Sequence, residues 1–234
     1  MLLRMLNQII DRLRKIEIFT VLIPTLDSEL SKTLSDCSTV LDLGCGPNSP
    51  VGALKYLTTR VGVEPFGPYL ELAKSRCTHD QFHQKLITEL DFEPRSFDAV
   101  IMIDVIEHMT EEDGLNALRL AEKWARKKVI INSPNGYIPQ KSLDENPLQE
   151  HKSGWSYSQM KELGYVSRGL AGPKWFRQEV EAETMGDDLL TSIRFRPKIF
   201  WFIVATIFQP IVFRFPKFAF SLMSVKSLNG TVNS

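Results

Sequence analysis

The stretch at residues 40–50 constrains the fold of this chain more than any other. It reads VLDLGCGPNSP, an apolar run that contains one acid and leads into two glycines one residue apart. Short apolar runs are typical of buried parallel strands, and glycine lets a backbone adopt positive φ and approach a ligand closely. We therefore expect a strand, a turn at Gly44 and Gly46, and a helix from about Val51 that points its free N–H groups at a nucleotide-like ligand. Asn48 replaces the third glycine of the dinucleotide fingerprint, so an ordinary tight turn is the alternative at this point.

Two further apolar runs also end in acids. Residues 60–63 lead into Glu64, which follows the glycine turn at about the 20-residue spacing that brings a carboxylate to ribose hydroxyls. Residues 98–103 lead into Asp104. Strand and helix patterns alternate over residues 39–128, and such alternation predicts βαβ units and a parallel sheet.

Together these motifs resemble the class I S-adenosylmethionine-dependent methyltransferases. The resemblance implies a Rossmann-like seven-stranded α/β sheet with helices on both faces, S-adenosylmethionine as the cofactor, and methyl transfer as the activity. The fourth-strand motif of that family matches residues 96–98 and 104–108 here. The cofactor-binding residues that we expect are Asp42, Gly44, Gly46, Glu64 and Asp104.

The length of 234 residues fits one α/β domain with an elaboration. We expect an N-terminal helical cap over residues 1–36 and a methyltransferase domain over residues 37–234. The last strand, at residues 218–226, resembles the antiparallel strand that closes the sheet of the family. Residues 171–217 would then form an insertion between the sixth and seventh strands.

Composition narrows the partners and the compartment. Lysine plus arginine and aspartate plus glutamate each number 28, so no overall field recruits nucleic acid. We expect no DNA partner, and the neutral charge disfavours an RNA partner unless a local basic patch binds it. Three cysteines without CxxC spacing fit a reduced, cytoplasmic compartment. Cys77, His79 and His83 lack a fourth ligand at zinc spacing, and we interpret them as solvent-facing.

Two histidines are candidates for the base that a hydroxyl acceptor needs, namely His108 and His151. Asp104, Glu107 and His108 would share one face of a helical turn, and His151 belongs to a loop expected over the same sheet edge. Two carboxylates and two imidazoles could hold a divalent ion, and the set resembles the metal site of the small-RNA 3′-terminal 2′-O-methyltransferases. The Glu-His pair also recurs in metal-free methyltransferases of small molecules, and we expect no metal here.

Residues 199–213 are almost wholly apolar and have basic residues on both sides. The run is shorter than the roughly 20 residues that span a bilayer. Its aromatic content and flanking charges suit a segment that lies in the headgroup layer of a membrane, with Trp201 and Phe202 as the inserting residues. A pocket lid or a homodimer face is the alternative.

These features lead us to expect methyl transfer to a small-molecule, glycan or lipid-linked acceptor, in the cytoplasm or at the membrane surface. A metal-dependent RNA 2′-O-methyltransferase is the first alternative, and it predicts a basic patch supplied by Lys127, Lys128, Lys141 and Lys152. A non-catalytic module that keeps the fold and binds the cofactor is the second.

Overall fold

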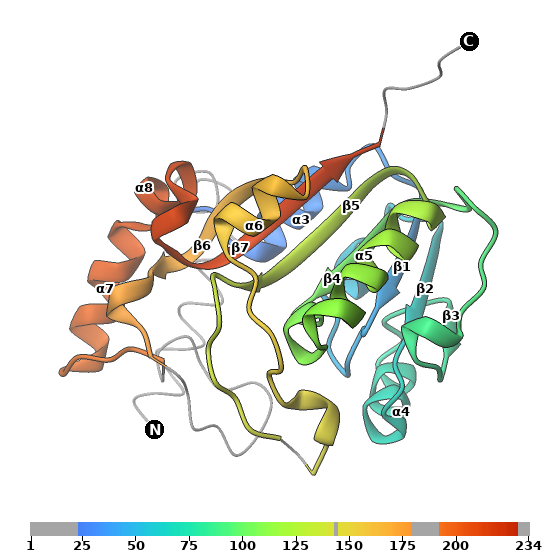
Figure 1. The fold of residues 1–234 in the computed structure, drawn as a ribbon, viewed down its shortest axis with the longest axis horizontal. Helices are drawn as coiled ribbons and strands as arrows, with labels where there is room; N and C mark the ends of the chain where they lie inside the picture. The colour runs from blue at the N-terminus through green and yellow to red at the C-terminus, as the bar shows by residue number, and fades with distance from the viewer. Residues whose placement is uncertain (1–22, 143–144, 179–191, 229–234) are drawn as a thin grey trace.

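The computed structural model describes residues 23–142, 145–178 and 192–228. Its centre is a seven-stranded sheet with the order β3-β2-β1-β4-β5-β7-β6 (Figure 1). The first five strands are parallel, and β7 runs antiparallel to both β5 and β6. The strands are β1 Thr39–Leu43, β2 Thr59–Val63, β3 Gln81–His83, β4 Phe97–Ile103, β5 Ala125–Pro134, β6 Val166–Pro173 and β7 Ala219–Ser227. The predicted Rossmann-like methyltransferase sheet is therefore confirmed.

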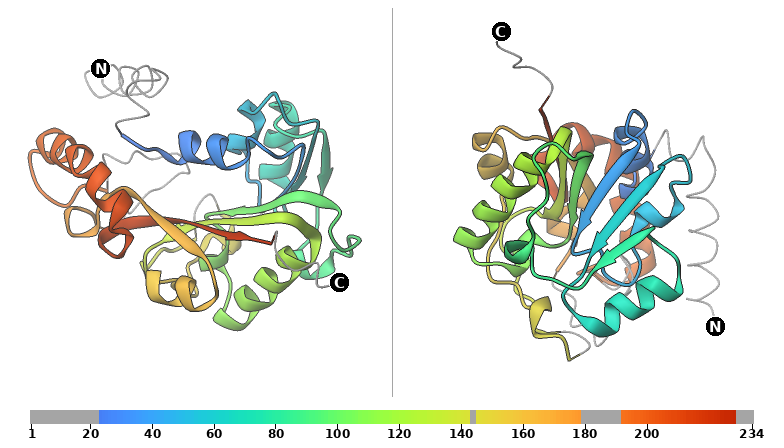
Figure 2. Two further views of the ribbon diagram at one scale, coloured as in Figure 1. Left: turned by 90° about the horizontal axis from the view of Figure 1, so that it is seen from above. Right: turned by 90° about the vertical axis from the view of Figure 1, so that its right-hand side faces the viewer.

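Helices cover both faces of this sheet, as Figure 2 shows from two sides. Two of them, α5 and α6, pack on one face together with Trp155, while α3 covers the other face with Leu30 and Leu34. The strands β1 and β4 are buried on both faces, which explains why they read as continuous apolar runs. The helices are α3 Leu26–Thr33, α4 Gly67–Ser75, α5 Glu111–Trp124, α6 Tyr157–Glu162, α7 Lys198–Ile207 and α8 Gln209–Arg214.

The N-terminal cap was predicted over residues 1–36. Its first part lies outside the described residues. Its second part contains α3, which packs against the sheet, and the boundary at residue 36 stays a prediction.

The helix predicted from Val51 is wrong. A short 3₁₀ turn, η1 Pro50–Ala53, stands in its place. The chain must reach β2 at Thr59 within a few residues, which leaves no room for a longer helix. A Cβ at Gly52 would lie 3.1 Å from the Cα of Thr78, so the turn also packs tightly against the strand-three side of the sheet. Among the described residues, no helix of eight or more residues directly follows the glycine turn.

The segment between β6 and β7 adds a pair of helices beside the edge of the sheet. Between β6 and β7 the insertion contains α7 and α8, which meet at Phe208. Glycines on β6 let the two helices approach closely, because a Cβ at Gly169 would lie 2.1 Å from the carbonyl oxygen of Val212. The pair forms the left-hand end of the molecule in Figure 1.

Candidate active site

The glycine loop after β1 adopts the conformation that its sequence predicts. Gly44 and Gly46 have φ of +70° and +54°, which residues with a Cβ rarely adopt. A Cβ at Gly44 would also lie 2.6 Å from Cγ2 of Val105, so only glycine fits there. The N–H groups of Gly44 and Cys45 both donate to the carbonyl oxygen of Val63, which holds the loop against the end of β2.

Glu64 lies directly after β2 and faces this loop. Its Oε2 accepts a hydrogen bond from the N–H of Gly46 at 3.0 Å, and its Oε1 accepts one from the N–H of Phe66 at 2.9 Å. Burial raises the pKa of the Glu64 carboxyl, and these two N–H donors oppose the shift. Each oxygen keeps a further lone pair, so the carboxylate can still accept ribose hydroxyls. The glycine loop and this buried carboxylate fit the sugar of a nucleoside cofactor.

Asp42 lies underneath the loop. Its Oδ2 accepts from Oγ of Ser49 at 2.5 Å and lies 3.1 Å from Nε2 of His79, whose Nδ1 pairs with the Thr78 hydroxyl at 2.9 Å. The solvent-facing interpretation of His79 is therefore wrong, because only 5% of it is exposed. Asp42 shapes the loop from below in this arrangement.

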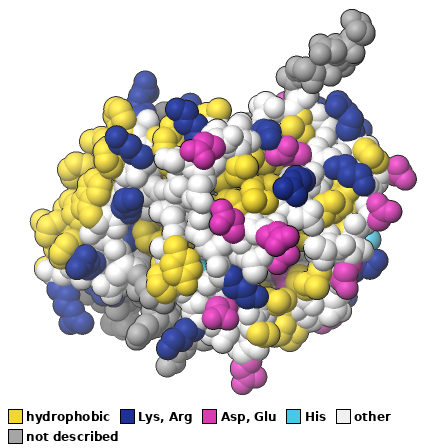
Figure 3. Space-filling view, in the orientation of Figure 1, with side chains coloured by type: hydrophobic (Ala, Val, Ile, Leu, Met, Phe, Trp, Pro, Cys, Tyr) yellow, Lys and Arg dark blue, Asp and Glu magenta, His cyan; other side chains and the backbone are white. Residues whose placement is uncertain are grey.

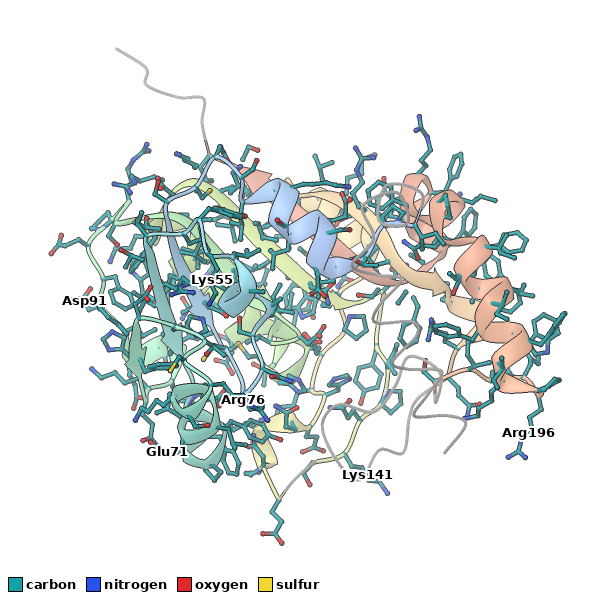
Figure 4. The ribbon with its side chains drawn as sticks, turned by 180° about the vertical axis from the view of Figure 1, so that it is seen from behind. Lys55, Glu71, Arg76, Asp91, Lys141 and Arg196 are labelled. Carbon is teal, nitrogen blue, oxygen red and sulfur yellow. The ribbon has the colours of Figure 1, made fainter. Side chains whose placement is uncertain are left out.

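The far side of the loop is held by Arg76. This residue caps α4, and its guanidinium donates to the carbonyl oxygen of Pro47 at 2.9 Å and to Oδ1 of Asn48 at 3.1 Å. Figure 4 labels Arg76 between α4 and the loop. The hydrogen bond from Arg76 gives Asn48, which replaces the expected third glycine, a structural role.

The end of β4 forms the second half of the site. Asp104 has φ of +53°, and its Oδ1 accepts from Nδ2 of Asn132 at 2.7 Å. Its main-chain N–H donates to the carbonyl oxygen of Asn132 at 2.9 Å. The exposed side chain of Asp104 is thus held at the carboxyl edge between β4 and β5. Its contact with the cofactor stays a prediction.

The turn after Asp104 is the 3₁₀ turn η3 Ile106–His108, and it buries a carboxylate. Glu107 is 2% exposed, and neither of its carboxylate oxygens has a partner of hydrogen-bond geometry among the described residues. Burial raises the pKa of Glu107, and the charge of Asp104 raises it further. The main-chain N–H groups of Val105 and Glu107 lower this pKa only in part, and a buried carboxyl group without a partner of hydrogen-bond geometry has free capacity to bind one.

A loop that comes later in the chain, at residues 152–155, holds this turn in place. The N–H groups of Lys152 and Ser153 donate to the carbonyl oxygen of Glu107 at 2.8 and 3.1 Å, and the indole of Trp155 donates to that of Ile106 at 3.1 Å. Trp155 is buried so closely against α5 that a Cβ at Gly114 would lie 2.4 Å from its ring. These contacts bring His151 to the buried carboxylate.

The two candidate bases therefore lie together, as predicted. The rings of His108 and His151 are 4.7 Å apart between centroids. Nδ1 of His108 lies 3.3 Å from the carbonyl oxygen of Glu150, and Nδ1 of His151 lies 2.6 Å from that of Ile138. One ligand atom from each of Glu107, His108 and His151 falls within 4.8 Å of the others, whereas Asp104 is not part of this group.

The pKa of His108 is lowered to about 4, first by burial and then by the charge of His151. The imidazole of His108 is consequently neutral near pH 7. A neutral imidazole whose other nitrogen is held by a carbonyl oxygen is the usual form of a histidine that binds a metal ion.

The basic patch predicted for an RNA substrate does not assemble at this site. Lys127 and Lys128 lie near the start of β5, at the opposite end of the sheet from the carboxyl edge. Both are engaged there, Lys127 with the carbonyl oxygen of Asp36 and Lys128 with the Asp36 carboxylate at 2.6 Å. Only Lys141 and Lys152 of the predicted set belong to the loop beside the histidines.

Comparisons with known proteins agree with this geometry. Residues 41–131 match the family described as "Methyltransferase domain". A search of curated proteins found no match. The chain is similar in fold to the methyltransferase domain of bacterial CtHen1-CN, with a TM-score of 0.51 and 20% identity over 86% of this chain and 97% of that one. It is also similar in fold to a chain of the "Complex between the Haloferax volcanii Trm112 methyltransferase activator and the putative methyltransferase", with a TM-score of 0.51 and 14% identity over 88% and 95% of the two chains.

Residues 41–131 therefore match a methyltransferase domain, and the seven-stranded sheet has the class I methyltransferase fold, as the motifs predict. Sequence reasoning missed Ser49 and His79 beneath the loop and Asn132 beside Asp104. Their partners lie 7, 37 and 28 residues away along the chain, and no local pattern signals such contacts.

Proposed function

We propose that the domain methylates a hydroxyl of a small-molecule, glycan or lipid-linked acceptor, and that Glu107, His108 and His151 hold a divalent cation beside that hydroxyl. One observation carries the proposal. The buried Glu107 carboxylate has no partner of hydrogen-bond geometry, and it lies with two imidazoles whose ligand atoms converge within 4.8 Å. Carboxylate and imidazole ligands suit first-row divalent ions such as Mn²⁺.

The cofactor and the cation would each supply one part of the chemistry. Bound S-adenosylmethionine supplies an electrophilic methyl group on a sulfonium, so the reaction needs alignment more than covalent help. A bound cation would polarise the acceptor oxygen and orient it. The glycine loop and Glu64 would hold the nucleoside, and the clamp of residues 152–155 on η3 would hold the acceptor side of the site.

A histidine base acting alone has less support. A general base works best when its pKa lies near the working pH, and the pKa of His108 is lowered to about 4 by burial and by His151. The expectation of a metal-free site came from the sequence and stays untested. The unpaired Glu107 carboxylate leads us to propose the opposite.

The acceptor classes follow from the surroundings of the site. The lysines that an RNA backbone would need are split between opposite ends of the sheet, whereas phosphate contacts normally supply most of the affinity for RNA. An apolar face on α7 and α8, described below, is the feature that supports a lipid-linked acceptor.

The test uses the full-length protein, methyl-labelled cofactor and cell extract separated into lipid, polar-metabolite and RNA fractions. We expect label in the lipid or polar fraction, loss of labelling with a chelator, and recovery with Mn²⁺ or Mg²⁺. Mn²⁺ binding measured by calorimetry should be lost in Glu107→Gln and in His151→Ala, and should persist in the control His83→Ala on β3.

Two outcomes would overturn the proposal in different ways. Label in the RNA fraction, with the same metal dependence, would establish the RNA 2′-O-methyltransferase alternative. Full activity with a chelator, together with no Mn²⁺ binding, would remove the cation and return His108 and His151 to the role of bases.

A further inference from the structure

The helical pair α7–α8 is packed the opposite way from an ordinary surface helix, which turns its large apolar residues inward. Its inner face toward β6 carries Ala205, Gln209 and Val212, all at most 4% exposed. The side chain of Gln209 accepts from the N–H of Gly172 at 2.8 Å and donates to the carbonyl oxygen of Gly169 at 3.0 Å. The hydrogen-bonded side chain of Gln209 and the small residues beside it therefore hold the two helices against the sheet.

The outer face carries the large apolar side chains instead. They recur three or four residues apart, so they form one stripe along both helices. The stripe consists of Phe200, Ile203, Ile207, Ile211 and Phe215, which are 55%, 52%, 66%, 51% and 56% exposed. Trp175, Phe195, Phe208 and Phe218 extend the apolar area around it, each at least 40% exposed. Figure 3 shows apolar side chains gathered at this end of the molecule.

Basic side chains surround the stripe. The exposed ones are Lys174, Arg194, Arg196, Arg214 and Lys217. Arg196 points away from the protein at the start of α7 (Figure 4). Residues 192–228 contain no aspartate or glutamate, and the five acids at 179–188 lie outside the described residues. An apolar area with a basic rim complements a bilayer surface that contains anionic lipids.

We propose that this face of α7 and α8 inserts into the headgroup region of an anionic lipid bilayer and attaches the enzyme peripherally. Among the described residues no helix is long and apolar enough to cross a membrane. The proposal rests on the α7–α8 face alone and does not depend on the cation site or on the acceptor.

Two other occupants of the face are less complementary to it. A second copy related by a twofold axis would set one basic rim against another. Residues 1–22 carry four basic and two acidic side chains, a net charge of 4 − 2 = +2, so they too match the sign of the rim. A bilayer with anionic headgroups supplies both the opposite charge and an apolar interior, whereas residues 179–191 carry five acids but no aromatic residue.

The structure also changes which residues insert. Trp201 and Phe202, which the sequence suggested, are only partly exposed. Trp201 packs against Phe176 and Phe195, with ring centroids 5.4 and 5.1 Å apart. Trp201 is therefore part of the support under the stripe, and substituting it would disturb the packing as well as the surface.

The test is vesicle sedimentation with the full-length protein. We expect binding to phosphatidylcholine vesicles that contain phosphatidylserine, weaker binding to phosphatidylcholine alone, and weakening by salt. The triple variant Phe200→Ser, Ile203→Ser, Ile207→Ser should lose about a hundredfold or more in affinity, because it removes three large apolar side chains from the interface. The matched control Leu72→Ser, Leu86→Ser, Val166→Ser changes three equally exposed apolar residues elsewhere and should bind like the wild type.

Cofactor binding by calorimetry shows that each variant is folded. Absence of wild-type binding at low salt, or equal loss in both triple variants, would overturn the proposal. A wild-type dimer that the α7 variant converts to a monomer, without vesicle binding, would assign the face to a second copy. Vesicle binding that appears only after deletion of residues 1–22 would assign it to that segment.

Discussion

At the scale of single residues, Glu64 shows how one side chain can serve both the fold and the ligand. Its two oxygens hold the N–H groups of Gly46 and Phe66, so the carboxylate orders the glycine loop before any cofactor arrives. A preorganised acceptor loses little conformational freedom when it binds a ligand. The same carboxylate is the residue for which ribose binding is predicted.

We expect Glu64→Ala to weaken the affinity for S-adenosylmethionine roughly ten- to a hundredfold, since a hydrogen bond to a charged group contributes about 1.5–3 kcal/mol. Isothermal calorimetry with the cofactor measures the change. Glu71→Ala on the exposed side of α4 is the control and should bind normally. Unchanged affinity in folded Glu64→Ala would show that the carboxylate serves the loop only.

At the scale of elements, α7 and α8 are attached to the sheet by close packing on two glycines of β6 and by the hydrogen bonds of one glutamine. Gly169 and Gly172 have no side chains that would keep the helices away from the strand. Gln209 accepts from the N–H of Gly172 and donates to the carbonyl oxygen of Gly169. A buried amide with both ends satisfied specifies a single position for the helices.

Gln209→Ala should lower the free energy of unfolding by about 1–3 kcal/mol, because two buried hydrogen bonds are lost and main-chain groups are left without partners. Urea denaturation followed by circular dichroism measures this. Gln84→Ala, a change at an exposed glutamine, should have little effect. A loss as small as that of the control would mean that apolar contacts alone hold the helical pair.

At the scale of the whole molecule, one carboxylate joins three strands at the end of the sheet opposite the active site. Oδ2 of Asp98 accepts from the N–H groups of Ser38 and Thr39 at 2.8 and 3.2 Å. Its Oδ1 lies 3.3 Å from the guanidinium of Arg126 and 3.6 Å from the ammonium of Lys127. Burial raises the pKa of Asp98, but these donors and cations outweigh burial, and the pKa lies below its ordinary value of 3.8.

This pKa shift predicts the acid limb of stability. A carboxyl group whose pKa is lower in the folded state stabilises it fully above the unfolded-state pKa, and the contribution is lost as the pH falls through the folded-state value. Asp98→Asn should therefore lower the stability at neutral pH by about 1.5–3 kcal/mol and flatten the loss below about pH 4. Urea titrations across the acid range measure both effects.

The control for this experiment is Asp91→Asn, whose side chain is 97% exposed beside Lys123 and should contribute almost nothing. An unchanged acid limb in Asp98→Asn would show that other carboxyl groups control acid unfolding.

The sequence by itself determined the parts of this protein that depend on local patterns. Apolar runs that end in glycine or acid predicted β1, β2 and β4, the positive φ of Gly44 and Gly46, and the position of Glu64. The seven-stranded sheet followed from the resemblance to the methyltransferase family. The run at residues 199–213 also showed from its length alone that it was too short to span a bilayer.

Only the tertiary structure decided the rest, because contacts between distant segments have no period in the sequence. The hydrogen bond between Trp155 and η3 brings His151 close to Glu107. His79 is buried because it pairs with Asp42. The glycines of β6 decide which side of α7–α8 faces the sheet, and thus which apolar residues stay exposed. Each outcome depends on the distance between two elements, and that distance exists only once the sheet has formed.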